Sequence, residues 1–193
     1  PENYRPIALT SCLCKTFERM VNARLTWYLE SNGVLTELQS GFRKGRSTTD
    51  QLVRLESFVR EAFVHGEHAV GVFFDLEKAY DTTWKHGILR DLETAGLKGR
   101  LPKFIEGFLA NRKFRVKAGS HLSNTLKQEM GVPQGSIPSV TLFVLKINDI
   151  VKSLPAGVRG SLFVDDFFIC YRSRLMHSIE RVLQGCLGKI ESW

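Results

Sequence analysis

The chain has 193 residues, 43% of them hydrophobic and 24% charged, a balance near the globular average that argues against a disordered or fibrous protein. No apolar run approaches the ~20 residues that span a bilayer, which excludes a membrane-spanning class. With 27 Lys and Arg against 20 Asp and Glu, the net charge is +7. This excess favours polyanionic partners, although many basic proteins simply carry a solvated positive face.

The cysteine pattern indicates a reducing compartment, because no Cys-x-x-Cys pair and no zinc-ribbon spacing occurs. Cys14 and Cys170 have apolar neighbours, so we expect both to be buried. The chain starts at Pro1 without a signal peptide and stops at Trp193 inside a helical pattern, so we expect it to be a piece of something longer.

Two helices are predicted in the first third of the chain. Apolar residues at helical spacing follow the candidate caps Thr10 and Ser11, and Gly33 ends this first helix. The second helix runs from about Thr48 to His65, behind a capping-box pattern that starts at Ser47. Its expected buried stripe consists of Leu52, Leu55, Val59, Ala62 and Phe63.

A strand, two helices and a basic hairpin are predicted next. The apolar run 69–74 is short and rich in β-formers, which indicates a buried strand ending at Asp75. Helices follow near 84–95 and 101–110. Residues 112–128 alternate apolar and basic side chains without an acid, which predicts a hairpin with one basic face. The alternative is a solvated edge strand that Lys and Arg protect from pairing.

The last third predicts a turn at Gly131–Gly135, a helix through Val151, a hairpin over Leu162–Tyr171 and a final helix. The pair Asp165-Asp166 falls at the turn of that hairpin. Helices, a strand and two hairpins in this order predict an α+β fold with a small antiparallel sheet backed by helices.

Three carboxylates are the strongest candidates for chemistry. Asp75 and the Asp165-Asp166 pair each lie where an apolar strand ends, so pairing of these elements in one sheet would bring them to one edge. Like charges that close repel unless a cation lies between them. Oxygen ligands suit Mg²⁺, and two such ions can support phosphoryl transfer. The alternative is that Asp165-Asp166 only forms a turn, since Asp tolerates left-handed geometry.

Five sequence words, in family order, resemble motifs of reverse transcriptases. Residues 73–81, FFDLEKAYD, are similar to the first palm motif, residues 131–136, GVPQGS, to the second, and residues 163–166, FVDD, to the third. Residues 3–7, NYRPI, and 41–51, GFRKGRSTTDQ, resemble fingers motifs of non-LTR (LINE-type) retrotransposon enzymes, with the jockey-like branch nearest. Together they cover nearly the whole chain.

The resemblance implies a right-hand polymerase with fingers over residues 1–68 and palm over 69–193, cut before the primer grip and thumb. It implies an RNA-directed DNA polymerase that uses an RNA template, a DNA primer and deoxynucleoside triphosphates (dNTPs), with two Mg²⁺ ions or with Mn²⁺. It places the enzyme inside the cell, in the nucleus, without a membrane partner. Without grip and thumb we expect this chain alone to be inactive.

The resemblance also implies roles for single residues. Asp75, Asp165 and Asp166 match the catalytic, metal-binding carboxylates, with Asp166 the less essential one. Tyr80 matches the aromatic gate under the sugar of the incoming nucleotide, where a ring leaves no space for a 2′-hydroxyl. A buried core tyrosine is the alternative for Tyr80.

Further contacts with the nucleotide are implied for Gln134, Gly135, Arg43 and Arg46. Gln134 matches the residue near the template and nascent pair, and a glycine at 135 allows close backbone approach. Arg43 and Arg46 match basic residues of the fingers that contact the triphosphate or the template. The alternative is that they lie in a solvated loop. Four basic residues of the predicted hairpin are expected to bind along a nucleic-acid backbone: Arg112, Lys113, Arg115 and Lys117.

Two positions depart from the family pattern. Val164 stands where LINE-type enzymes commonly have Ala, and Pro138 precedes Ser139 where the reverse order is usual. Two competing functions remain. One is a viral RNA-dependent RNA polymerase palm, against which Tyr80 argues. The other is a catalytically inactive nucleic-acid-binding relic, which the three intact aspartates disfavour.

Overall fold

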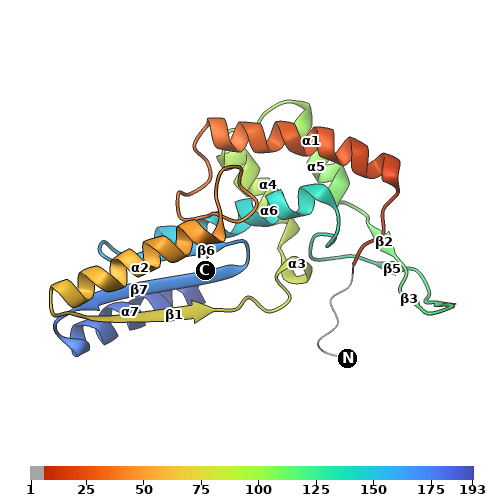
Figure 1. The fold of residues 1–193 in the computed structure, drawn as a ribbon. Helices are drawn as coiled ribbons and strands as arrows, with labels where there is room; N and C mark the ends of the chain where they lie inside the picture. Colours follow the sequence, from red (N-terminus) through yellow and green to blue (C-terminus); the bar gives the residue numbers. More distant parts are fainter. Residues whose placement is uncertain (1–6) are drawn as a thin grey trace. The chain divides into compact units, whose positions relative to one another are not determined.

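The computed structural model describes residues 7–193 and divides them into two compact units (Figure 1). The first unit consists of residues 7–34 and 77–146, and the second of residues 35–76 and 147–193. The mixed α+β class with small antiparallel sheets agrees with the prediction. Residues 3–6 of the first fingers word lie outside the described part. The fingers–palm boundary at 68/69 stays a prediction.

The first unit is mainly helical. Its helices are α1 (Cys12–Ser31), α3 (Ala79–Thr82), α4 (Lys85–Thr94), α5 (Arg100–Leu109) and α6 (Ile137–Ile147). Aliphatic side chains at helical spacing give it a core that excludes water. The most deeply buried of these are Leu25, Leu29, Ile88, Leu92, Ile105, Leu109 and Leu142. Polar contacts add to this packing, such as the Tyr28 hydroxyl that donates to the Ala95 carbonyl at 3.0 Å.

A buried carboxylate fixes the start of α6. Glu18 of α1 is 2% exposed, and its Oε2 accepts a hydrogen bond from the Ile137 N–H at 3.1 Å. The first N–H groups of a helix have no partner within the helix, and the helix dipole favours a negative charge there. A residue of α1 thus caps a helix that begins more than a hundred positions later in the sequence, directly behind the turn at 131–135.

The second unit is built on a three-stranded antiparallel sheet of order β1-β7-β6. Its elements are α2 (Thr48–Val64), β1 (His68–Phe74), a 3₁₀ helix η1 (Asn148–Ser153), β6 (Arg159–Phe163), β7 (Asp166–Ser173) and α7 (Met176–Glu191). Helix α2 packs against β1, and α7 packs against β7 and η1 (Figure 1). The predicted capping box is confirmed at Ser47 and Asp50, and the two hydrogen bonds from Ser47 lower the pKa of Asp50.

The basic segment 112–128 forms the predicted hairpin, in two short antiparallel ladders. Strand β2 (Lys113–Phe114) pairs with β5 (Leu126–Lys127), and β3 (Lys117–Ala118) pairs with β4 (His121–Leu122). All eight strand residues are exposed. Across residues 7–193, no helix is long and apolar enough to span a bilayer.

Several expected burials are wrong. Cys14 is exposed in the first turn of α1, where its thiol donates to the buried Glu18. In α2, Leu52 and Phe63 are 65% and 76% exposed. Strand β1 has no buried residue, and Phe73 is 77% exposed. Apolar periodicity identifies the helix or strand, but the neighbours that cover each face are set by tertiary packing.

Cysteine alkylation tests this burial. Burial raises the pKa of Cys170 to about 11, and burial also raises the pKa of Cys186. A buried thiol of pKa near 11 is only about 0.1% thiolate at pH 8, and the thiolate is the reactive form. In the native protein at pH 8, iodoacetamide should therefore modify exposed Cys12 and spare Cys170 and Cys186, as read by mass spectrometry. Modification of all four in urea is the control, and rapid native labelling of Cys170 would contradict this packing.

Candidate active site

Three aspartate positions lie at one end of the β1-β7-β6 sheet. Phe74, the last residue of β1, pairs with Phe167 of β7, so Asp75 follows at the level of Asp166. Asp166 pairs with Phe163 of β6, and Asp165 lies in the turn between β6 and β7. The strand and the hairpin thus pair in one sheet, as expected, and the register brings the three positions to the same end.

The carboxylates at this end are accessible to solvent. Asp75 and Asp166 are exposed, and Asp165 is half-buried. Within residues 7–193, no group of three or more His, Cys, Asp or Glu side chains is arranged to hold a metal ion. The backbone therefore brings the three positions together without placing their side chains in one cluster, and their role as metal ligands stays a prediction.

The turn that carries Asp165 contacts a buried residue that the sequence patterns do not single out. Val164 has φ +62° and is 5% exposed. Its N–H donates to Oε1 of Gln39 at 3.0 Å, and the Gln39 side chain is fully buried. Gln39 stands two residues before the fingers word that begins at Gly41. That position is the only signal in the sequence that could have pointed to it.

Tyr80 lies in the first unit, against the turn at 131–135. Its carbonyl accepts the Val132 N–H at 2.7 Å, and the Thr83 carbonyl accepts the Gly131 N–H at 2.9 Å. The half-buried Tyr80 ring stacks on Phe143 of α6, with centroids 5.1 Å apart and an interplanar angle of 29°. The segments that resemble the first and second palm motifs are therefore hydrogen-bonded to each other. The position of the Tyr80 ring is fixed by its packing on Phe143 and by the backbone hydrogen bond of Tyr80.

Gln134 and Gly135 follow in the same turn. The Gln134 carbonyl accepts the Ala8 N–H at 2.7 Å. The Gln134 side chain is half-buried, and among the described residues it forms no hydrogen bond that would hold it away from a substrate. Gly135 is exposed with φ +105°, and a Cβ there would lie 2.9 Å from the Ala8 carbonyl oxygen. The positive φ and the nearby Ala8 carbonyl therefore both require glycine at position 135.

The guanidinium groups of Arg43 and Arg46 brace their own loop in the second unit. Arg43 donates from Nη1 to the carbonyls of Thr36 at 2.6 Å and Gln39 at 3.2 Å. Arg46 donates to the Glu37 carbonyl at 2.8 Å and forms an ion pair with the Glu37 carboxylate. The hydrogen bond from Arg46 lowers the pKa of Glu37. Contact with a triphosphate would therefore compete with these intramolecular partners.

The hairpin at 112–128 concentrates positive charge. Lys113 and Lys127 are directly opposite in the β2–β5 ladder, and like charges in that position repel. Nearby, Lys85 donates to the Gln128 carbonyl. Desolvation, followed by the charges of Arg112 and Lys127, lowers the pKa of Lys85. An anion at this surface would relieve the repulsion.

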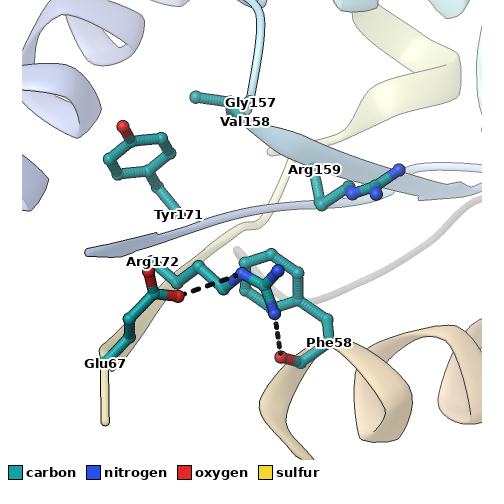
Figure 2. A pocket seen from close by; sticks show the side chains of 7 residues that line it. All are labelled: Phe58, Glu67, Gly157, Val158, Arg159, Tyr171 and Arg172. Carbon is teal, nitrogen blue, oxygen red and sulfur yellow. Dashed lines mark hydrogen bonds and ion pairs between the residues drawn. The ribbon is translucent and has the colours of Figure 1, made fainter. Parts of the chain in front are cut away.

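A separate hollow of about 500 Å³ lies toward the other end of the sheet (Figure 2). Arg172 lines this hollow. Its guanidinium group forms ion pairs with the carboxylates of Glu61 at 2.8 Å and Glu67 at 3.3 Å, and it lies over the Phe58 ring, 5.2 Å from the ring centroid. In Figure 2, Tyr171 points to the opposite side of the strand. Arg172 lies six positions after Asp166 along β7, roughly 20 Å away, so this hollow is not part of the aspartate site.

Comparison with known proteins matches all 193 residues to the family described as reverse transcriptase (RNA-dependent DNA polymerase). The chain is 31% identical to a probable RNA-directed DNA polymerase from transposon X-element of Drosophila melanogaster. It is 29% identical to the RNA-directed DNA polymerase from mobile element jockey of the same species. Each alignment covers 100% of this chain, and the chain spans 22% of each relative.

Two solved telomerase structures share the fold. An apo telomerase from Candida tropicalis has a TM-score of 0.63 at 13% identity, over 89% of this chain and 36% of its own. A Candida albicans telomerase with a fragment of telomeric RNA has a TM-score of 0.53 at 12% identity, over 90% of this chain and 32% of its own. The motif words, the fold and the full-length family match agree: this chain belongs to the reverse transcriptase family and is related to the jockey-like polymerases of non-LTR retrotransposons.

Proposed function

We propose that this chain carries the catalytic carboxylates of an RNA-directed DNA polymerase that works in the nucleus. The reaction joins the α-phosphate of a dNTP to a primer 3′-hydroxyl along an RNA template, and pyrophosphate leaves. The observation that carries the proposal is the convergence of Asp75, Asp165 and Asp166 at one end of the β1-β7-β6 sheet, inside two motif words of the family.

The donor set at this end fits magnesium. The three side chains offer hard oxygen ligands, and their accessibility leaves room for water and phosphate oxygens. Asp75 and Asp165 would hold both ions, with Asp166 as the lesser partner, and Mn²⁺ accepts the same ligands. When bound, such ions neutralise charge on the transferred phosphate and activate the attacking hydroxyl.

The chain's own residues then bind and orient the substrates. Tyr80 is proposed to lie under the sugar of the incoming dNTP, and its stacking on Phe143 supports a rigid wall there. Gln134 and Gly135 are proposed to meet the template and nascent pair, which the exposed turn at Gly135 permits. Because the reaction leaves little covalent chemistry to protein groups, such positioning is the main contribution of these residues.

Basic residues are proposed to bind phosphates. Arg43 and Arg46 carry forked donors that suit a triphosphate, provided that they exchange the loop carbonyls that they now bind. The hairpin bases Arg112, Lys113, Arg115 and Lys117 are proposed to follow the nucleic-acid backbone, with support from the opposed Lys113 and Lys127.

Replacing Tyr80 with Ala tests the sugar gate. Removal of the ring should raise the use of ribonucleotides relative to dNTPs by about 10- to 100-fold, because steric exclusion of one small group is worth that much. Tyr80→Phe keeps the ring and should keep the wild-type ratio. Steady-state incorporation of matched nucleotide pairs gives the ratio, and an unchanged preference in Tyr80→Ala would remove Tyr80 from this role.

Primer extension tests the function as a whole. The protein that contains this chain, purified and given an RNA template, a DNA primer, dNTPs and Mg²⁺, should extend the primer, and a chelator should stop it. Ribonucleoside triphosphates in place of dNTPs should give little product, which separates this function from an RNA polymerase. Tight binding of primer–template without any metal-dependent extension would instead identify a non-catalytic relic.

A further inference from the structure

We infer that Gln39 is a positioning residue for Asp165, because its buried amide holds the turn before Asp165 in a left-handed backbone conformation. The role assigned to Asp165 rests on the proposed function, whereas the contact made by Gln39 does not. The inference combines an unusual backbone angle, a buried hydrogen-bonding side chain and a close approach between two chain segments.

The unusual backbone angle belongs to Val164. Its φ of +62° falls in the left-handed region, and the residue is 5% exposed. A β-branched side chain is disfavoured there, because its Cβ crowds the following carbonyl, at a cost of roughly 1–2 kcal/mol. Such a conformation persists only where surrounding contacts enforce it. The turn at Val164 sets the direction in which the next residue, Asp165, leaves the strand.

The enforcing contact comes from Gln39. Its Oε1 accepts two backbone hydrogen bonds, from Val164 N–H at 3.0 Å and from Gly41 N–H at 2.8 Å. With 0% exposure, the amide has no access to water that could replace these bonds. One side-chain oxygen thus ties the segment at 39–41 to the tip of the β6–β7 hairpin.

Backbone contacts lock the same two segments together. Ser40 N–H donates to the Leu162 carbonyl at 2.9 Å, and Leu162 N–H donates to the Leu38 carbonyl at 3.0 Å, in parallel arrangement. A Cβ on Gly41 would lie 2.4 Å from Cγ2 of Val164 and 2.5 Å from its backbone nitrogen. The absence of a side chain at Gly41 therefore leaves room for Val164, and Gln39 holds the turn in place.

Hydrogen exchange tests the contact without any catalysis. Gln39→Leu keeps the volume and removes the amide, that is, both the Oε1 acceptor and the Nε2 donor that reaches the Val164 carbonyl at 3.5 Å, so exchange of the Val164 N–H should rise about tenfold or more. Gln51→Leu is the matched control. Gln51 donates to Leu38 and Ser40 of the same segment but not to Val164, so exchange at Val164 should stay at the wild-type rate. If Gln39→Leu does not fold, Gln39→Asn, one methylene shorter, gives the same comparison. Unchanged exchange at Val164 would overturn the inference.

Metal affinity tests the consequence for Asp165. Mn²⁺ binding followed by electron paramagnetic resonance should weaken about tenfold in Gln39→Leu and recover when Val164→Gly is added, because glycine adopts a positive φ at little cost. Faster exchange with unchanged Mn²⁺ affinity would show a merely structural contact and overturn the positioning role. Failure of the wild-type protein to extend primers would overturn the proposed function alone, since both readouts here are independent of extension.

Discussion

Asp75→Asn and Asp165→Asn are each expected to lower primer extension by about 1,000-fold or more. Asparagine keeps the size of the side chain and removes its charge. A metal ion held by these carboxylates would contribute several kcal/mol to phosphoryl transfer, so loss of a carboxylate that would hold it should be costly. Asp166→Asn should cost much less, about tenfold, because Asp166 is proposed to be the less essential of the three carboxylates. Single-turnover extension with purified protein and excess Mg²⁺ measures all three.

Asp149→Asn is the matched control for this series. It makes the same substitution in the same unit, at a residue of η1 that pairs with Lys152 at 2.8 Å and lies outside the two aspartate words. It should extend primers at the wild-type rate, and unchanged circular dichroism should exclude misfolding of the variants at Asp75, Asp165 and Asp166. Normal extension by Asp75→Asn would refute the metal assignment, whatever the other variants do.

Local patterns in the sequence are sufficient to predict most of the elements. The α2 capping box is one example, since Ser47 and Asp50 are three residues apart and need no distant partner. The hairpin that carries Asp165 is another, because an apolar run, a short turn and a second apolar run lie consecutively in the chain. The sheet end also follows once these strands pair, so the amino-acid sequence alone is enough to identify the three aspartates as candidates.

Long-range packing explains what the sequence could not predict. Gln39 reaches a hairpin that lies 125 positions later, and no spacing rule connects the two. Phe73 has a β-strand pattern like that of its neighbours yet is 77% exposed, although its ring lies 4.4 Å from that of Phe168 on the paired strand β7. Arg43 and Arg46 match a motif for phosphate contact, but the motif does not reveal that loop carbonyls already occupy their donors.

Gly131→Ala should cause a large loss of stability, about 3 kcal/mol or more in the free energy of unfolding. Gly131 is buried with φ +78°, and a Cβ there would lie 2.4 Å from the Asp81 carbonyl oxygen. The left-handed angle alone costs an alanine roughly 1 kcal/mol. The clash adds to it, since backbone atoms cannot rotate away as a flexible side chain can, and overpacking costs roughly 1–3 kcal/mol.

Gly33→Ala separates the two causes. Gly33 has φ +61° in the same unit, but no atom lies within 4 Å of a Cβ built there, so only the backbone cost of about 1 kcal/mol applies. Urea denaturation of both variants should show the larger loss at Gly131, and equal losses would contradict the close packing of the turn on residues 80–83.

Because the Thr83 carbonyl accepts the Gly131 N–H and the Tyr80 carbonyl accepts the Val132 N–H, any shift that relieves the clash displaces the backbone of Tyr80. In the protein that contains this chain, Gly131→Ala should therefore also weaken discrimination against ribonucleotides, an effect that Gly33→Ala should not share.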